Sequence, residues 1–370
     1  MSEQVETLVV GAGQAGLSTA YHLRRLGVPT LVLEARRRVG DVWRERYDSL
    51  RLFSPARGTG LPGMAFPAPR NSYPTGAEMG DFLEAYAAAM DLPVRTGVHA
   101  ERVTARDGGG FRVSTADGGA VDAEQVVVAT GGHQRPSVPA FAADLDPGIV
   151  QVHSAGYRNP GQLQDGPVLV VGASHSGADL ALEAAATHPT YLSGRVHGEV
   201  PFTLGRPSAE LAYLVIPTVF LHVLTLRTPV GRRAAAAVRR GGAAPLIRVK
   251  RRDLAAAGVE LVEARTVGVR DGRPLLADGR VLADVRTVLW CTGFREDFRW
   301  VEPAPLDEDG YPRHRRGVVE DVPGLYFTGL VFQYAFASML VLGAGRDARY
   351  VARHVAARRG APALAAAAAG

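Results

Sequence analysis

Two short glycine-containing stretches are the residues of this 370-residue chain best suited to chemistry. The first reads GAGQAG and begins at Gly11, and the second reads GASHSG and begins at Gly172. A glycine turn between a strand and a helix lets the backbone approach a diphosphate. The phosphate charge then lies against the N–H groups and the positive dipole of the helix N-terminus. The two stretches therefore predict two dinucleotide sites.

In the first turn each glycine has a separate task. Gly11 permits the tight turn, Gly13 lets the backbone approach a pyrophosphate, and Gly16 lets the following helix pack close to its strand.

The second turn departs from the strict pattern at one position. Gly172, Ser174, Ser176 and Gly177 occupy it, so a serine replaces the second glycine. The Cβ of Ser174 should hold a diphosphate slightly farther away, while its hydroxyl can donate a hydrogen bond. Ser176 is either a phosphate ligand or the N-cap of the helix, since both tasks use the same hydroxyl.

The residues that follow the next strand distinguish the two sites. Glu34 lies 18 residues after Gly16, and Arg195 lies 18 residues after Gly177. A carboxylate accepts hydrogen bonds from an adenosine ribose and repels a 2′-phosphate, whereas a guanidinium can pair with that phosphate. The first site should take an unphosphorylated adenosine and the second should prefer NADPH; alternatively, Arg195 is an ordinary surface arginine.

Two nucleotides on one chain make chemical sense if one is a flavin. NADPH gives up its electrons as a hydride, and FAD can accept them and then react with O2. We therefore expect FAD at the first site and NADPH at the second.

The elements around the turns define the fold class. Residues 5–10 read as a strand, 15–26 as a helix and 30–33 as a strand, and the order repeats at 168–171, 178–187 and 190–192. The prediction is an α/β protein with two doubly wound, Rossmann-like dinucleotide-binding domains. The FAD domain should comprise residues 1–158 and 295–356, with the NADPH domain, 159–294, inserted into it.

Three further apolar runs, at 125–129, 287–290 and 325–327, end in small residues. Each reads as a buried strand that delivers a backbone turn to the carboxyl edge of a parallel sheet, where ligands bind. Thr130 and Gly131 follow the first run, and Gly329 and Leu330 follow the last. A helix from about residue 335 to 351 should direct its N-terminus at the flavin ring. Glycine-rich turns predict a β-meander over 100–122 and a second hairpin over 266–281.

Composition excludes several function classes. The net charge is +5, but Lys250 is the only lysine and every other basic side chain that contributes to this charge is an arginine. Because the chain is also rich in Ala and Gly, the arginine bias indicates GC-rich coding rather than selection for phosphate binding, and no nucleic-acid partner is expected. Cys291 is the only cysteine, which excludes a disulfide, a dithiol and a cysteine-cluster metal site; no metal site is predicted. No secretory signal is visible, and a cytoplasmic location is expected.

The most apolar segment is LAYLVIPTVFLHVLTL, at residues 211–226. It is shorter than the ~20 residues that span a bilayer, and Pro217 interrupts it. We expect a buried or channel-lining helix pair, with membrane contact as the less favoured alternative. The surrounding segment, 202–250, should shape the substrate pocket, and the Ala-rich residues 357–370 should form a frayed tail.

Taken together, these motifs resemble the class B flavin-dependent monooxygenases, which include flavin-containing and Baeyer–Villiger-type enzymes. The resemblance covers nearly all of residues 5–356. It is carried by GAGQAG with Glu34 and by segments that begin at Gly40, Arg46, Ser72, Val126, Gly172, Leu289 and Gly324: GDVW, RYDSLRLFSP, SYPT, VVVATGGHQRPSVP, GASHSGADLA, LWCTGFRED and GLYFTGL.

The resemblance implies roles for individual residues. Contacts with FAD are implied for Gly11, Gly13, Gly16, Glu34, Gly40, Trp43, Thr130, Gly131, Gly329 and Leu330, and contacts with NADPH for Gly172, Ser174, Ser176, Gly177 and Arg195. It also implies transfer of one oxygen atom from O2 to a small organic substrate through a flavin C4a-(hydro)peroxide. No residue is assigned as a catalytic base, and the oligomeric state is not predicted.

Three alternatives stay open. His153 either orients the linker between the domains or transfers a proton. The chain could also be an NADPH-dependent reductase or oxidase that inserts no oxygen, because the outcome depends on how dry the pocket is. A redox-sensing flavoprotein docked to a membrane through residues 211–226 is the third.

Overall fold

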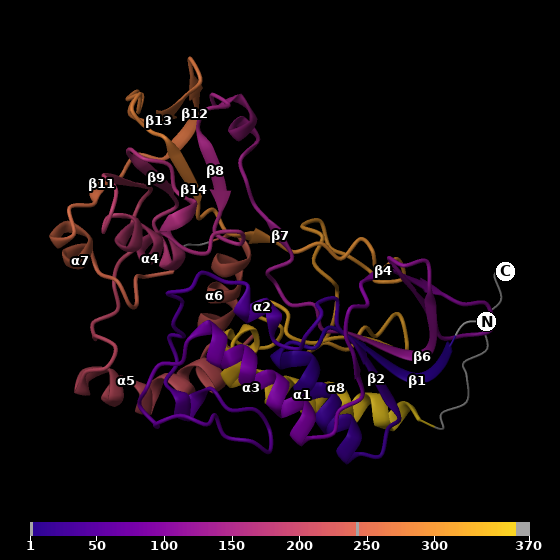
Figure 1. Cartoon of the computed structure of the whole chain (residues 1–370). Helices are drawn as coiled ribbons and strands as arrows, with labels where there is room; N and C mark the ends of the chain where they lie inside the picture. Colours follow the sequence, from indigo (N-terminus) through magenta and orange to yellow (C-terminus); the bar gives the residue numbers. More distant parts are fainter. Residues whose placement is uncertain (1–2, 242–243, 360–370) are drawn as a thin grey trace.

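The structure, a computed structural model, describes residues 3–241 and 244–359, which form an α/β protein with two main sheets. Figure 1 shows the first sheet on the right, around β1 and β6, and the second at the upper left, around β9 and β14.

The first sheet is mostly parallel, in the order β3-β2-β1-β6-β5-β4, and β16 also pairs with β6. Its strands are β1 (Glu3–Val10), β2 (Thr30–Leu33), β3 (Val94–Arg95), β4 (Ala100–Ala105), β5 (Phe111–Thr115), β6 (Ala120–Val128) and β16 (Leu325–Phe327). The predicted meander over 100–122 is confirmed, because β4, β5 and β6 are antiparallel neighbours. Strand β6 pairs with β5 near its start and with β16 near its end, which brings residues 325–327 beside 126–128.

The second sheet is entirely parallel, in the order β11-β10-β9-β14-β8. Its strands are β8 (Val150–His153), β9 (Val168–Val171), β10 (Thr190–Ser193), β11 (Glu260–Val262) and β14 (Thr287–Trp290). Strand β8 lies within the range expected for the FAD domain, yet it pairs with β14 in the second sheet. The predicted hairpin over 266–281 is present as β12 (Thr266–Arg270) and β13 (Arg273–Leu276).

Helices cover both sheets. Against the first lie α1 (Gln14–Arg25), α3 (Gly76–Ala89) and α8 (Val341–Arg358), together with the short α2 (Asp41–Arg44); α4 (His175–Ala184) and α7 (Arg251–Ala256) lie against the second. The first turn of α3 is closed by a capping box between Thr75 and Glu78. The short β7 (Arg135–Pro136) and β15 (Phe294–Arg295) pair antiparallel between the two sheets (Figure 1).

The C-terminal helix begins later and ends later than expected. Phe336–Met339 form a 3₁₀ turn, and α8 starts only at Val341. At its other end α8 continues through Arg358, so the first residues of the predicted tail are helical. Residues 360–370 of that tail lie outside the described residues.

The apolar segment 211–226 is not buried as predicted. It forms the end of α5 (Pro207–Thr218) and the π-helical turn η4 (Val219–Val223), and α6 (Pro229–Arg239) follows. Leu211 is 69% exposed, Leu214 71% and Val215 59%. Ala209 is the buried residue of α5, so this helix leaves its apolar face largely uncovered.

Residues 220–226 contact residues 334–336, which fall in the range predicted for the FAD domain, although 220–226 themselves fall in the range predicted for the NADPH domain. Leu226 N–H donates to the Tyr334 carbonyl (2.8 Å), and Phe336 N–H donates to the Leu224 carbonyl (2.9 Å). The centres of the Phe220 and Phe336 rings lie 4.5 Å apart. In the described part of the chain, no helix is both long enough and apolar enough to cross a membrane.

Candidate functional site

The first glycine turn is held by close backbone contacts. Gly11 has φ +107°, and a Cβ there would lie 2.7 Å from the Ala129 carbonyl oxygen. A Cβ at Gly16 would lie 1.8 Å from the Gly11 carbonyl oxygen. Both positions therefore require glycine: the first for the turn beside the end of β6, the second for the close approach of α1 to its strand.

Gly13 differs from these two glycines because it faces open space. It is the N-cap of α1 with an extended backbone, and a Cβ added there would meet nothing within 4 Å. Below the turn, Glu34 accepts the backbone N–H of Ala12 (2.9 Å) and of Arg36 (3.0 Å). An uncrowded helix N-terminus beside a half-buried carboxylate is suited to a diphosphate and an adjoining ribose.

The second glycine turn repeats this geometry. Gly172 has φ +110° and its Cβ would lie 2.4 Å from the Cys291 carbonyl oxygen, while a Cβ at Gly177 would lie 1.7 Å from the Gly172 carbonyl oxygen. Ser174 is the N-cap of α4, in the place of Gly13, and its side chain makes no capping bond. The alternative that Ser176 is the N-cap is wrong, because Ser176 is the second residue inside the helix.

Arg195 is one residue away from the place that its spacing predicts. Gly11 N–H donates to the Leu33 carbonyl and Gly172 N–H to the Ser193 carbonyl, so the residue that corresponds to Glu34 is Gly194. The stretch from the last glycine of the turn to the end of the next strand is one residue shorter in the second unit, from Gly177 to Ser193 against Gly16 to Leu33, which moves Arg195 one position further along. Its side chain is exposed, just past the carboxyl end of β10.

The segment that follows strand β16 comes close to the first glycine turn. Gly329 has φ +76°, and a Cβ there would lie 2.7 Å from the Cβ of Ala15, in the first turn of α1. The next residue, Leu330, is buried. Just past the carboxyl end of β6, Gly131 has φ +69°. The hydroxyl of the exposed residue Thr130 accepts a hydrogen bond from Gln134 Nε2 (3.2 Å). The segments around Gly131 and Gly329 therefore flank the N-terminus of α1.

Gly40 and Trp43 belong to the short helix α2. Gly40 has φ +88°, and a Cβ there would lie 2.2 Å from the Gly80 carbonyl oxygen, so α2 and α3 touch through their glycines. Trp43 is half-buried and packs against the core cluster that contains Met79 and Phe82. This contact fixes the orientation of α2 against α3.

A cavity of about 150 Å³ lies beside the β7–β15 pair. It is lined by Arg36, Val42, Glu45, Arg46, His133, Gln134, Pro136, Ala155 and Phe294. Arg36 is ion-paired with Glu45, whereas the half-buried guanidinium of Arg46 has no ion pair or hydrogen bond to any described residue and lies 5.1 Å from the Phe294 ring centre. Burial lowers the pKa of Arg46, and the nearby charge of Arg36 lowers it further.

Sequence reasoning did not single out Arg46. The residue lies in the segment RYDSLRLFSP that carried the family resemblance, but only the tertiary contacts show that its charge is uncompensated.

The same segment joins the domains through a polar contact. Tyr47 OH donates to Asp179 Oδ2 (3.2 Å), and Arg248 forms an ion pair with the same buried carboxylate (2.9 Å). Desolvation raises the pKa of Tyr47, and the charge of Asp179 adds to the shift. Nearby, the rings of Phe53 and His175 lie 4.7 Å apart, so the start of α4 rests against the first domain.

His153 is engaged through both ring nitrogens. Nδ1 accepts the Ala155 N–H (3.1 Å), which leaves Nε2 to donate to the Gly293 carbonyl (3.0 Å). Desolvation lowers the pKa of His153. These contacts support the orienting role at the linker over proton transfer.

Glu296 is a half-buried residue with a buried Oε1 atom that sequence reasoning also missed. A Cβ added at Gly132 would lie 3.1 Å from Glu296 Oε1 and would also contact the Val331 side chain. Oε1 has no hydrogen-bond partner among the described residues. Burial raises the pKa of Glu296 to about 7, partly offset by the Val331 backbone and by Arg239. Glu296 thus lies between the Gly131 and Gly329 segments.

A metal centre is not formed by the described residues, which contain no group of three or more His, Cys, Asp or Glu able to hold an ion. The site is instead made of helix N-termini, glycine turns and isolated charges, which suits organic phosphates.

Comparisons with known proteins agree with this geometry. A family model described as pyridine nucleotide-disulphide oxidoreductase matches residues 8–191. An uncharacterized CzcO-like oxidoreductase of Geobacillus kaustophilus is 37% identical over 354 residues, which span 95% of this chain and 98% of that protein. The probable indole-3-pyruvate monooxygenase YUCCA3 of Arabidopsis thaliana is 27% identical over 388 residues, 95% of this chain and 86% of its own.

A solved structure extends the similarity to three dimensions. A variant of the flavin monooxygenase from Stenotrophomonas maltophilia superimposes with a TM-score of 0.76 at 26% identity, and the match covers 96% of this chain and 99% of that one.

The raised pKa of Glu296 predicts a pH-dependent effect on stability. The folded protein keeps this proton up to about pH 7, whereas the unfolded chain releases it near the ordinary value of 4.5. The free energy of unfolding should therefore fall as pH rises through this window. Glu296→Gln, which cannot ionise, should match the wild type below pH 4.5 and exceed it by on the order of 2 kcal/mol at pH 8. Thermal unfolding across this range measures the difference; a difference that is the same at every pH would contradict the assignment.

Proposed function

The chain belongs to the class B flavin-dependent monooxygenase family, and on that premise we propose that it is an FAD-dependent, NADPH-consuming monooxygenase that transfers one oxygen atom from O2 to a small organic substrate. One observation carries the proposal: the chain builds the same strand–turn–helix geometry twice, at the carboxyl ends of parallel strands in two separate sheets. One turn is closed by a carboxylate, and the other is followed by an exposed arginine.

FAD is assigned to the first turn. Gly11, Gly13 and Gly16 form its cradle, and Glu34 is suited to accept hydrogen bonds from an adenosine ribose. Gly40 and Trp43, Thr130 and Gly131, and Gly329 and Leu330 come from three segments that flank this cradle. When bound, FAD would accept electrons from NADPH and supply the reaction with O2.

NADPH is assigned to the second turn. Gly172 and Gly177 hold the turn against the end of β14, and Ser174 and Ser176 offer hydroxyls near the N-terminus of α4. Arg195 would pair with the 2′-phosphate. The uncompensated charge of Arg46, on the wall between the domains, is suited to a phosphate of a bound nucleotide.

The domain division follows from the two turns. We propose a Rossmann-like, doubly wound FAD domain from residues 1–158 and 295–356, and a Rossmann-like NADPH domain from 159–294. The exception within residues 1–158 is strand β8, which we assign to the NADPH domain because it pairs with β14. Helix α1 and the Gly329 segment, which belong to the two parts of the first domain, are in contact.

Thiol chemistry of the disulfide-reductase type does not suit this chain. Cys291 is its only cysteine, and burial raises the pKa of that thiol to about 12. A thiol with such a pKa is a poor nucleophile near neutral pH.

Gly13→Val tests the flavin assignment. A side chain at Gly13 meets no neighbour in the protein but would project toward the diphosphate, so the variant should fold yet be purified with little or no flavin. Absorbance near 450 nm and the unfolding temperature of the flavin-free protein are the measurements. Ser174→Val is the matched control, since it places the same side chain at the same point of the other turn and should keep its flavin. Full flavin content in Gly13→Val would count against the first site.

Arg195→Ala tests the choice of nicotinamide nucleotide. Loss of a guanidinium–phosphate pair should raise the KM for NADPH by the equivalent of ~1–3 kcal/mol and leave the KM for NADH nearly unchanged. Steady-state flavin reduction with each nucleotide is the measurement. Arg24→Ala removes the same charge at the other end of α1 and should alter neither. Equal effects on both nucleotides would remove the 2′-phosphate role from Arg195.

The oxygen balance distinguishes a monooxygenase from an oxidase. With a true substrate, H2O2 should fall well below the NADPH consumed, and label from ¹⁸O2 should appear in the product. An NADPH oxidase would release one H2O2 for each NADPH whatever compound is added. If a broad panel of amines, sulfides and ketones never lowers the H2O2 yield, the oxygen-insertion proposal fails while both cofactor assignments stand.

A further inference from the structure

The lobe formed by α5, η4 and α6 (residues 207–239), here called the α5–α6 lobe, concentrates the exposed apolar side chains of the protein. Eight large hydrophobic residues are exposed in the described chain, and five of them lie in this lobe: Leu211, Leu214, Val215, Val223 and Val230. Single exposed apolar residues are ordinary on a protein surface, whereas a concentration of them marks an interaction site.

The exposed apolar residues of α5 form one outward face. Leu211, Leu214 and Val215 follow the spacing of residues that share a helix face. Other residues attach the helix to the first domain: Ala209 is buried, and Glu210 accepts a hydrogen bond from Asn71 (2.8 Å). Tyr213 packs under the guanidinium of Arg57, which lies 5.2 Å from its ring centre. The outward leucines and valine are therefore not needed to hold the lobe in place.

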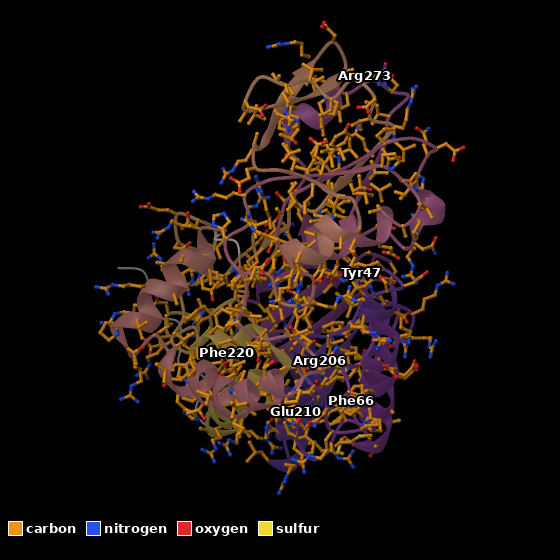
Figure 2. All side chains as sticks on the ribbon, turned by 90° about the vertical axis from the view of Figure 1, so that its left-hand side faces the viewer. Tyr47, Phe66, Arg206, Glu210, Phe220 and Arg273 are labelled. Carbon is orange, nitrogen blue, oxygen red and sulfur yellow. The ribbon has the colours of Figure 1, made fainter. Side chains whose placement is uncertain are left out.

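The lobe and its two ends are also strongly basic. Residues 206–240 contain six arginines and a single acidic residue, Glu210. Arg239 stacks over Tyr311, with its guanidinium 4.0 Å from the ring centre. The other five are exposed and have no ion pair with any described residue: Arg206, Arg227, Arg232, Arg233 and Arg240. Figure 2 shows where Arg206, Glu210 and Phe220 lie on the lobe.

We propose that the α5–α6 lobe docks the protein onto the surface of a bilayer that contains anionic phospholipids. Helix α5 would lie in the plane of the interface with Leu211, Leu214 and Val215 among the upper acyl chains. The arginines around it would contact the lipid phosphates. This arrangement needs no membrane-spanning helix.

Charge favours a lipid surface over a second copy of this chain. A two-fold contact brings the same patch of both subunits together, so the uncompensated arginines of one lobe would face those of the other. An anionic surface instead compensates all of them at once.

Vesicle flotation tests the proposal on the full-length protein with its flavin. The wild type should float with vesicles of phosphatidylcholine and phosphatidylglycerol and stay at the bottom with phosphatidylcholine alone. The double variant Leu211→Ser/Leu214→Ser should lower the bound fraction at least tenfold. Val267→Ser is the matched control, because Val267 is a 49% exposed apolar residue on the hairpin of the other domain. Phe220 is not a suitable target, since its ring packs against Phe336.

Charge reversal supplies the second arm. Arg232→Glu/Arg233→Glu should also reduce flotation with the anionic vesicles, and added salt should weaken binding of the wild type. Unfolding temperature and flavin content identify any variant that has failed to fold. The proposal is overturned if the wild type does not float, or if both double variants float like the wild type. A lobe-dependent dimer in sedimentation velocity, without vesicle binding, would assign the face to a second copy.

Discussion

The structure depends on two backbone contacts in which a helix glycine touches the carbonyl of the turn that precedes it. A Cβ at Gly16 or at Gly177 would lie less than 2 Å from the carbonyl oxygen of Gly11 or Gly172, so only hydrogen fits. This approach places the N-terminus of each helix directly at the carboxyl edge of its sheet. The end of the neighbouring strand, at Ala129 or Cys291, packs under the same turn. Everything that could touch a nucleotide is arranged around these two points.

Local features of the sequence predicted this part of the molecule. The glycine spacing, the β-branched runs before it and the amphipathic run after it gave α1 to within one residue, and both turns have the predicted backbone. The same holds for the strand that ends before Thr328 and Gly329, because its apolar run and small residues are contiguous. Turn chemistry and periodicity are properties of neighbouring residues, and they can be read without knowledge of the fold.

Features that arise from distant contacts were missed or misplaced. Strand β8 appeared to belong to the first domain, since its partner β14 lies far along the chain. Arg195 was aligned with Glu34 by counting, but the stretch from Gly177 to the end of β10 is one residue shorter than that from Gly16 to the end of β2, which shifts the register. The apolar composition of 211–226 suggested burial, but composition does not show whether a neighbour exists to cover a helix. The Arg46 guanidinium and Glu296 Oε1 are unusual because neither has a hydrogen-bond partner among the described residues, which only the tertiary structure can reveal.

The two turns differ in a way that bears on how firmly each could hold a ligand. In the first, the Glu34 carboxylate accepts the Ala12 N–H and so fixes the turn from within. In the second, Gly194 occupies the corresponding place, and a Cβ there would lie 3.1 Å from the Ala173 nitrogen. In the described ranges no side chain accepts a hydrogen bond from that N–H, and Ser174 adds bulk where Gly13 has none. The first turn is therefore preorganised by the protein itself, as a resident cofactor requires, whereas the second is less constrained, as suits a nucleotide that must bind and leave in each cycle.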